Sequence, residues 1–486
     1  MVAGLRGPAG QGMDERLLDR MESPRMSPQD RLLDPMCSPL PSPGPSPPPS
    51  PGRGSRPPQA HAPEPRGHPK EPEASLFSSW CVLTNTLLGV GILGLPWAIS
   101  SVGLGLGGLM MAAAGGIAAF ALHLLADIVV TMTGGSQGPA EVSFYSVCIQ
   151  ASPRARYVVD VAIALKCFGV ATSYLQVIGQ LGTSLAVDAA IGFDGLSVQE
   201  VRCGIIALVL VAVIMPSVFH KRITKTAAQN MLAIGSWLYV ASLAALAVLG
   251  ILPTPGAAES SWRFEPPEGM GFQAVATAVP VFIFSFTCHQ NLFPIATELR
   301  GRTRLRLDIM LGGAILTGLL IYCAAGLGAY LQFGGAVRQN FLLNLPLNGP
   351  VLLGRCLVIM AVVFTYPLQL HPCRRSLMIL AESARGTFFT RREERILRRV
   401  LTVCILLGTL AVAASVNDLG LTLAFVGAVG SNTVVLIMPP FMYLRLHGHR
   451  GALRLPALGL FVLGCAILPT CLTGIVLKLI DAGQHR

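Results

Sequence analysis

The stretch TNTLLGVGILGLPW, from Thr84 to Trp97, lies within a membrane-length apolar segment that is not built to stay helical throughout. Gly89, Gly91 and Gly94 fall within six residues, and Pro96 follows them. Each glycine costs a helix about 1 kcal/mol relative to alanine, and proline removes a backbone donor. Because lipid offers no water to freed backbone groups, such a break is tolerated only where it faces protein, a ligand or a water-filled cavity. The stretch therefore indicates a transporter binding site rather than a plain anchor.

The composition is that of a membrane protein. Of the 486 residues, 52% are hydrophobic and 13% are charged, and the mean hydropathy is +0.60. The formal charge of +11 does not indicate nucleic-acid binding, because the basic residues lie in short loops between long apolar runs. The twelve cysteines are scattered, mostly singly, without the spacing of a metal site. We expect a chain whose surroundings are the lipid bilayer and which needs no metal or organic cofactor.

Eleven apolar stretches are each long enough to cross about 30 Å of hydrocarbon. They run over 75–100, 104–132, 157–187, 201–218, 227–252, 272–296, 308–332, 350–373, 396–416, 419–444 and 455–479. The boundary between the first two is the weakest, because Gly103 to Gly108 leaves almost no loop. The sequence predicts an all-α membrane protein with eleven transmembrane helices.

Loop charge supports this map. Of the 36 Lys and Arg residues, 29 lie in the N-terminal tail and in every second loop, whereas five lie on the opposite side. Lys166 and Arg355 lie inside spans or at their edges. By the positive-inside rule, the N-terminus is cytosolic and the C-terminus lies outside or in a lumen. A wrong number of spans would scramble this alternation.

The tail, residues 1–74, is a separate unit. It is rich in proline and serine, as in SPLPSPGPSPPPSP from Ser38 to Pro51, and contains six Ser-Pro steps. This composition favours extended polyproline conformations and gives no packed core. We expect a disordered cytosolic tether. A more specific role, as a target of proline-directed kinases or a binding segment for cytosolic partners, is the alternative.

A second discontinuous span runs from Pro280 to Arg300 and reads PVFIFSFTCHQNLFPIATELR. The run His289-Gln290-Asn291 in its middle is costly in lipid unless it faces a cavity or partners. This is the sixth span, five after the first, so the two cross the membrane in opposite directions. Interrupted helices at matching places in two halves are typical of inverted-repeat transporters. The predicted halves are 75–252 and 272–444, and the helix 455–479 is an addition.

The ends of broken helices suggest what such a site binds. Free amides at one half-helix N-terminus attract an anion such as an α-carboxylate. Free carbonyls at the other half's C-terminus attract a cation, such as Na⁺ or an α-amino group. A zwitterionic amino acid needs both.

Four motifs, in order, resemble the amino acid/auxin permease family of LeuT-fold transporters. They are TNTLLGVGILGLPWA, IFSFTCHQNLFPIATELR, TYPLQLHPCRRSL at 365–377 and LAFVGAVGSNTVVLIMPPFMYLR at 423–445. The resemblance covers residues 75–480 and points to the sodium-coupled neutral amino acid transporters and the fungal vacuolar amino acid transporters. It implies a LeuT-like 5+5 inverted repeat plus one helix.

The resemblance also implies site residues. The broken first span would wrap a small neutral amino acid with Thr86, Leu87, Leu88, Gly89, Val90 and Gly91. The broken sixth span would face it with Phe286, Thr287 and Cys288. Asn85 and Thr365 match positions that help hold Na⁺ in sodium-coupled members. The alternatives are an interhelical hydrogen bond for Asn85 and a bond back to its own helix for Thr365.

Two departures from the family pattern matter. The loop 253–271 has no cysteine, and the whole chain has no Asn-x-Ser/Thr sequon, which favours a vacuolar or lysosomal membrane over the plasma membrane. Lys166 lies about 13 Å into the third span at 1.5 Å per residue. It is expected to snorkel to the cytosolic surface, to pair with Asp127 or Asp160, or to act as a protonatable group near the cation site.

Three functions compete. The leading one is secondary active transport of neutral amino acids by alternating access, coupled to Na⁺ or H⁺. The second is a membrane amino-acid sensor that signals through its N-terminal tail. The third, a membrane-embedded enzyme, rests only on His123 and Asp127, which are spaced i, i+4 without a third catalytic partner.

Overall fold

The computed structural model describes residues 74–132, 143–189, 195–219, 226–254, 262–268, 270–447 and 452–484. The predicted disordered tail lies outside these residues, apart from Ala74. Within them the chain is almost entirely helical, and the helices long and apolar enough to cross a membrane number ten, or eleven when one bent pair is counted as a single span. The predicted all-α architecture with eleven spans is therefore confirmed.

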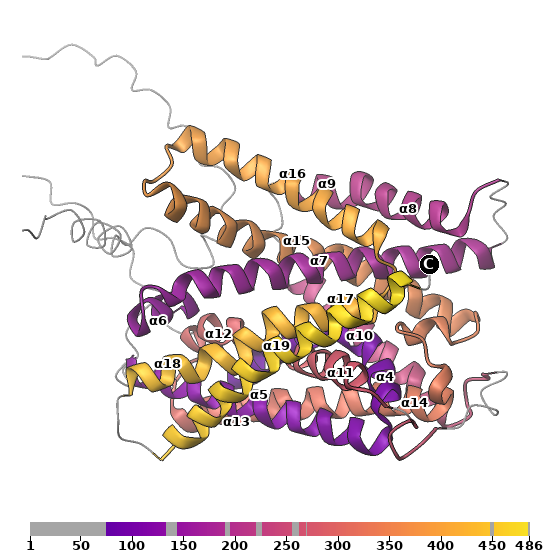
Figure 1. Ribbon diagram of the computed structural model, residues 1–486, viewed down its shortest axis with the longest axis horizontal. Coiled ribbons are helices and arrows are strands. Elements are labelled where there is room, and N and C mark those ends of the chain that lie inside the picture. Colours follow the sequence, from indigo (N-terminus) through magenta and orange to yellow (C-terminus); the bar gives the residue numbers. More distant parts are fainter. Residues whose placement is uncertain are drawn as a thin grey trace, which may run out of the picture. The chain divides into compact units, whose positions relative to one another are not determined.

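The spans follow one another in the predicted order (Figure 1). They are α3 with α4 (Leu76–Leu87 and Gly91–Val102), α5 (Leu104–Met132), α7 (Ala155–Asp188), α8 with η1 and α9 (Val198–Val209, Leu210–Ile214 and Met215–Phe219), α10 (Thr226–Val248), α11 with η3 and α12 (Phe272–Ser285, His289–Asn291 and Leu292–Glu298), α13 with η4 and α14 (Arg304–Tyr322, Cys323–Leu327 and Gly328–Phe333), α15 (Gly349–Arg385), α16 (Arg391–Ser415), α17 with η7, η8 and α18 (Leu419–Val426, Gly427–Ser431, Thr433–Ile437 and Met438–Leu446) and α19 (Arg454–Gln484).

Some boundaries differ from those read in the sequence. A short helix, α6 (Phe144–Ala151), precedes α7 and begins with a capping box at Ser143. The eighth span, predicted to end at 373, continues to Arg385 and stops at Gly386, whose φ of 73° is the left-handed conformation that ends helices. Its polar last turns do not look like a membrane span, which is why the apolar pattern missed them.

The weakest predicted boundary is resolved by a glycine turn. Gly103 has φ 86°, so α4 gives way to α5 with hardly any loop. A Cβ at Gly103 would lie 2.5 Å from the carbonyl oxygen of Glu265, and the amides of Leu104 and Gly105 donate to the carbonyls of Arg263 and Phe264. The segment before α11 therefore holds this turn in place.

Close backbone contacts organise the centre of the bundle. α4 packs along α11, and α7 packs along α15. A Cβ at Gly427 would lie 2.0 Å from the carbonyl oxygen of Pro280, so the tenth span approaches α11 at a distance that only glycine allows. The division into the repeats 75–252 and 272–444 stays a prediction.

Candidate functional site

The first span is broken where the glycines predicted it. α3 ends at Leu87, α4 begins at Gly91, and the two halves are bent by 57°. In the described part of the chain, the backbone amides of Gly89, Val90 and Gly91 have no hydrogen-bond acceptor. The first turn of α4 thus offers free N–H groups at a helix N-terminus, which is where anions bind.

The sixth span is also interrupted. α11 ends at Ser285, and a short 3-10 turn, His289–Asn291, leads into α12. Thr287 donates its hydroxyl to the carbonyl of Ile283 at 2.8 Å, and its amide donates to the carbonyl of Phe284. Phe286 and Cys288 are fully buried. The prediction of a second break is therefore correct, and its polar run lies inside the protein.

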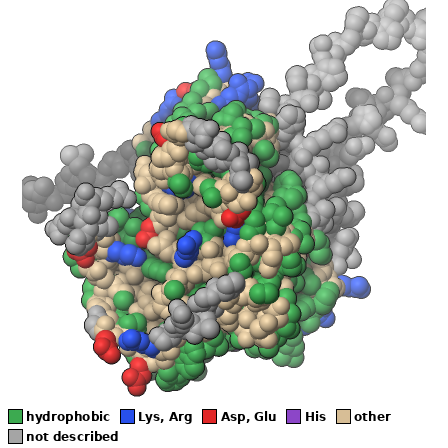
Figure 2. Space-filling view, turned by 90° about the vertical axis from the view of Figure 1, so that its right-hand side faces the viewer, with side chains coloured by type: hydrophobic (Ala, Val, Ile, Leu, Met, Phe, Trp, Pro, Cys, Tyr) green, Lys and Arg blue, Asp and Glu red, His purple; other side chains and the backbone are tan. Residues whose placement is uncertain are grey.

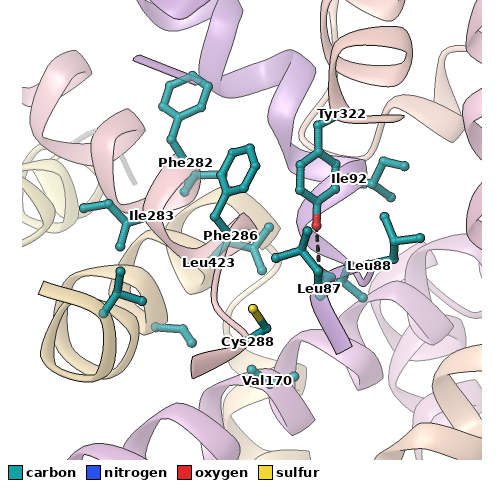
Figure 3. Packing of buried hydrophobic residues seen from close by; sticks show 14 of the residues in the cluster. Leu87, Leu88, Ile92, Val170, Phe282, Ile283, Phe286, Cys288, Tyr322 and Leu423 are labelled. Carbon is teal, nitrogen blue, oxygen red and sulfur yellow. Dashed lines mark hydrogen bonds between the residues drawn. The ribbon is translucent and has the colours of Figure 1, made fainter. Parts of the chain in front are cut away.

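The two breaks meet face to face. A Cβ at Gly91 would lie 2.7 Å from Ser285 Oγ, so the start of α4 rests directly on the end of α11. Tyr322, from α13, shares its hydroxyl proton between the carbonyl oxygens of Leu87 at 2.6 Å and Ser285 at 2.8 Å. Its ring packs edge-on against Phe286 with centroids 5.2 Å apart (Figure 3). One buried side chain therefore holds the C-terminal ends of both interrupted half-helices.

α3 and α12 are also joined, at the ends that lie away from the breaks. The amide of Ala74 donates to the carbonyl of Glu298, and the amide of Arg300 donates to the carbonyl of Ala74, each at 3.0 Å. The two breaks are thus linked twice, by Tyr322 near their centres and by this backbone pair. A movement of α3 would carry α12 with it.

Lys166 lies beside the second break. Its side chain is buried, and Nζ donates to Gln290 Oε1 at 3.0 Å. The expectation that it snorkels to the surface is wrong, and within the described residues no carboxylate lies at ion-pair distance from it. Its stem packs on the tenth span, since a Cβ at Gly430 would lie 2.4 Å from Lys166 Cβ. The third interpretation of Lys166, a protonatable group near the cation site, stays a prediction.

His289 and the predicted ion residues make different contacts. His289 is fully buried, with Nε2 3.2 Å from the carbonyl oxygen of Ala118. Thr365 donates to the carbonyl of Ala361 at 2.8 Å. This is the bond to its own helix that was the alternative to a role in Na⁺ binding. Asn85 is half-buried and makes no hydrogen bond to any described residue. The structure thus brings the two breaks together but does not join Asn85 to Thr365.

The pair His123 and Asp127 belongs to a charged network and not to a catalytic cluster. Arg304 pairs with Asp127 and Asp308 and lies 2.7 Å from His123 Nε2, while His123 Nδ1 lies 2.9 Å from Asp308. His447 Nε2 lies 3.4 Å from Asp127. Burial is the main cause of a lowered pKa at His447, so its contact with Asp127 is that of a neutral imidazole at pH 7. The network ties together the ends of α5, α13 and α18.

Sequence reasoning missed Tyr322 and Ser285. Their contacts across the breaks are with residues far away in the chain, and Tyr322 lies in an apolar run that is typical of an ordinary span. The available signal was a tyrosine well inside that run, since a buried tyrosine needs a partner for its O–H.

Two interrupted helices that meet inside an eleven-span bundle define a membrane transporter of the LeuT-like fold. The fold is similar to that of the solved structure described as "Inward facing conformation of Mhp1", with a TM-score of 0.50 and 15% sequence identity over 85% of this chain and 90% of that one. The chain belongs to the family of transmembrane amino acid transporter proteins, whose model matches residues 72–472. The family is one of transporters and not of enzymes.

Relatives within the family include proteins of both expected branches. Vacuolar amino acid transporter 5 of Schizosaccharomyces pombe is 29% identical over 420 residues, which cover 84% of this chain and 96% of the relative. Vacuolar amino acid transporter 6 of Saccharomyces cerevisiae is 29% identical over 82% of this chain and 98% of its own length. Sodium-coupled neutral amino acid transporter 7 of Rattus norvegicus is 25% identical over 75% and 78%.

Proposed function

We propose that this protein is a secondary active transporter of neutral amino acids that works by alternating access around its two broken helices. The observation that carries this proposal is the contact between the breaks, in which Gly91 rests on Ser285 and Tyr322 bonds to both helix ends. Free amides at the first break would hold the substrate carboxylate. The polar turn after Phe286 would form the facing wall. The chemistry of both breaks therefore favours an amino acid as the substrate.

The second break supports a proposal for the coupling ion. The ion would be H⁺ or Na⁺, and Lys166 favours H⁺. Lys166 is a buried amine whose one polar partner among the described residues is Gln290, and it touches the tenth span at Gly430. A proton gained or lost there would change the interaction between α7 and the turn before α12. Asn85 and Thr365 would be the ligands if Na⁺ were the coupling ion.

The membrane would be that of a vacuole or lysosome, with the N-terminus in the cytosol. The vacuolar relatives, which this chain matches over most of their length, support the first part. The distribution of 29 Lys and Arg against five supports the second. An acidic lumen would also supply the H⁺ gradient.

Reconstituted uptake tests the proposal. The purified full chain in liposomes is given a panel of labelled amino acids, with Na⁺ and pH gradients imposed separately. We expect concentrative uptake of small neutral amino acids under the pH gradient. If a substrate binds but no flux follows, the protein is instead an amino-acid sensor, whose output would run through the tail. If neither gradient drives uptake of any amino acid, coupled transport is ruled out.

A further inference from the structure

One side of α16 is exposed from the first turn of the helix to its middle. Arg391, Arg395, Arg399, Val403 and Leu407 follow one another at intervals of four residues, and each of them is exposed. Side chains four positions apart lie on one side of a helix, each above the last. α16 packs on α7 and α15 with its other residues. These five side chains therefore form one continuous row that the bundle leaves uncovered.

The chemistry of this row changes between Arg399 and Val403. Val403 is 43% exposed and Leu407 is 59% exposed, and both lie on a helix that is apolar and long enough to cross a membrane, so they face acyl chains. Arg399 lies about 6 Å beyond Val403 along the helix, and Arg395 another 6 Å beyond that. The headgroup layer of one leaflet is about 5–8 Å thick. The arginines therefore lie at and just beyond the depth of the lipid phosphates.

A second exposed row runs beside the first and mixes charge with apolar surface. It contains Arg392, Ile396 and Val400, again at intervals of four residues. Ile396 is 53% exposed and Val400 is 51% exposed. Apolar side chains thus continue next to the arginines at the level where the acyl chains of a lipid meet its headgroup.

The carboxylates near these arginines are engaged with other groups. Glu393 pairs with Arg385 at 2.9 Å and also caps the start of α16, and Glu394 pairs with Arg398 at 3.1 Å. In the described part of the chain, no carboxylate lies at ion-pair distance from the four exposed arginines Arg391, Arg392, Arg395 and Arg399. Like charges four positions apart destabilise a helix. An anion bound along this face would remove that repulsion.

The arginines are held on a formed helix and not on a loose loop. Thr390 begins α16 with a capping box, and Arg374 of α15 donates to Thr402 of α16 at 2.9 Å. Thr402 is 1% exposed, so this bond fastens the two helices together behind the exposed face. Figure 2 shows Lys and Arg side chains together with hydrophobic ones at the top of the molecule, where α16 lies in Figure 1.

We propose that this face of α16 binds a phospholipid whose headgroup carries phosphate monoesters, as in a phosphatidylinositol bisphosphate. Two phosphate monoesters carry about −3 to −4 in charge, which matches the four exposed guanidiniums. Guanidinium groups bind phosphate oxygens through paired hydrogen bonds. The acyl chains lie along Ile396, Val400 and Val403. This binding does not depend on which substrate the protein transports.

Lipid binding to the purified full chain in neutral detergent tests the inference. The probes are dioctanoyl forms of phosphatidylinositol bisphosphate, phosphatidylserine and phosphatidylcholine, and the Kd of each is measured. We expect the bisphosphate to bind at least tenfold more tightly than phosphatidylserine, and phosphatidylcholine not to bind measurably. Each arginine replaced by glutamine should weaken the bisphosphate about fivefold, so the double variant Arg395→Gln/Arg399→Gln should lose about thirtyfold. Arg395→Lys/Arg399→Lys, which keeps the charge, should lose much less.

The matched control is Arg263→Gln/Arg338→Gln, which also removes two exposed arginines but none on α16, and should leave the Kd unchanged. An unchanged Kd in the double glutamine variant overturns the inference, as does equal affinity for phosphatidylserine or phosphatidylcholine. Equal affinity for the water-soluble inositol bisphosphate headgroup overturns it too, because the site would then bind an anion and not a lipid. Thermal unfolding without lipid, together with the lysine variant, separates lost binding from lost folding. Liposome uptake of amino acids tests the proposed function separately.

Discussion

The two breaks reach the same result by different means. Between Leu87 and Gly91 the chain is interrupted by glycine, and what it presents there is backbone. Between α11 and α12 the interruption carries polar side chains, of which His289 reaches Ala118 and Gln290 reaches Lys166. The first break thus consists of glycines, which have no side chains. The second break contains polar side chains that bond to other helices.

Under the proposed function, this difference would give the two breaks different tasks. A backbone surface can hold the charged ends common to all amino acids, without reference to the side chain. A set of titratable or polar side chains can respond to an ion. Added bulk should therefore damage the first break, and removal of a functional group should damage the second.

The largest expected effect is at the second break. Lys166→Met keeps the apolar stem against Gly430 but removes the group that donates to Gln290. We expect accumulation driven by a pH gradient to be lost, with Na⁺ dependence unchanged, while exchange of labelled for unlabelled amino acid continues. Liposome uptake under each gradient measures this.

The control for that experiment is Lys478→Met, which removes a lysine whose Nζ lies 3.7 Å from Asp418, away from the second break. It should retain accumulation driven by a pH gradient. Normal pH-driven uptake in Lys166→Met would show that Lys166 has no part in coupling. The second break would then have no known coupling role.

The close packing of the first break is tested by adding a methyl group to its glycines. Gly91→Ala would place a Cβ 2.7 Å from Ser285 Oγ, whereas a Cβ at Gly89 would meet nothing within 4 Å. Overpacking costs about 1–3 kcal/mol, more than the roughly 1 kcal/mol gained by replacing a helical glycine. We expect Gly91→Ala to lower uptake about tenfold and to lower thermal stability, and Gly89→Ala to leave stability unchanged.

A second substitution sharpens this result. Ser285→Gly removes the side chain that the new methyl group meets, so it should restore much of the stability lost in Gly91→Ala. Equal stability in Gly91→Ala and Gly89→Ala, measured by thermal unfolding of the purified chains, would contradict close packing of the two breaks.

Tyr322 connects the two breaks, and its removal should have a smaller effect. Tyr322→Phe leaves the ring against Phe286 but takes the donor from the carbonyls of Leu87 and Ser285. The loss of a buried hydrogen bond costs about 1 kcal/mol, or roughly fivefold in an equilibrium. We expect a decrease in uptake of about that size together with lower thermal stability.

Tyr366→Phe is the matched control. Tyr366 is equally buried, and its hydroxyl lies 2.7 Å from Thr409 on α16, away from both breaks. It should lose stability but keep uptake. If the two variants behave alike in transport, Tyr322 is a packing residue and does not couple the breaks.

The sequence predicted the positions of both breaks because their causes are local. Gly89, Gly91 and Pro96 weaken a helix wherever it lies, and a polar run such as His289-Gln290-Asn291 marks a buried irregularity in any span. The eleven spans followed equally from apolar length and loop charge. These features depend on composition over a few residues or a single span.

The contacts that make a site of these breaks could not be predicted in this way. Lys166 and Gln290 are 124 positions apart, and Tyr322 and Leu87 are 235 apart. Which residues of different helices come into contact depends on the packing of the whole bundle. Periodicity placed Lys166 inside the third span correctly, but it left a snorkelling side chain and an ion pair as alternatives to the amide contact found.

The smallest expected effect separates the two coupling ions. Thr365 donates its hydroxyl to the carbonyl of Ala361 at 2.8 Å, within its own helix, and valine has nearly the same shape. Thr365→Val also removes a partner of Tyr174 on α7, which keeps Gln369 as a second one. Since the bond to Ala361 is local, the substitution should change uptake driven by a pH gradient by no more than about twofold. Uptake with and without Na⁺ measures this, and Asn85→Ala is tested beside it. If both variants lose a Na⁺-driven component while Lys166→Met retains it, the ion binds at Asn85 and Thr365. The first break would then hold both substrate and ion, and the second would lose the coupling role that its polar side chains suggest.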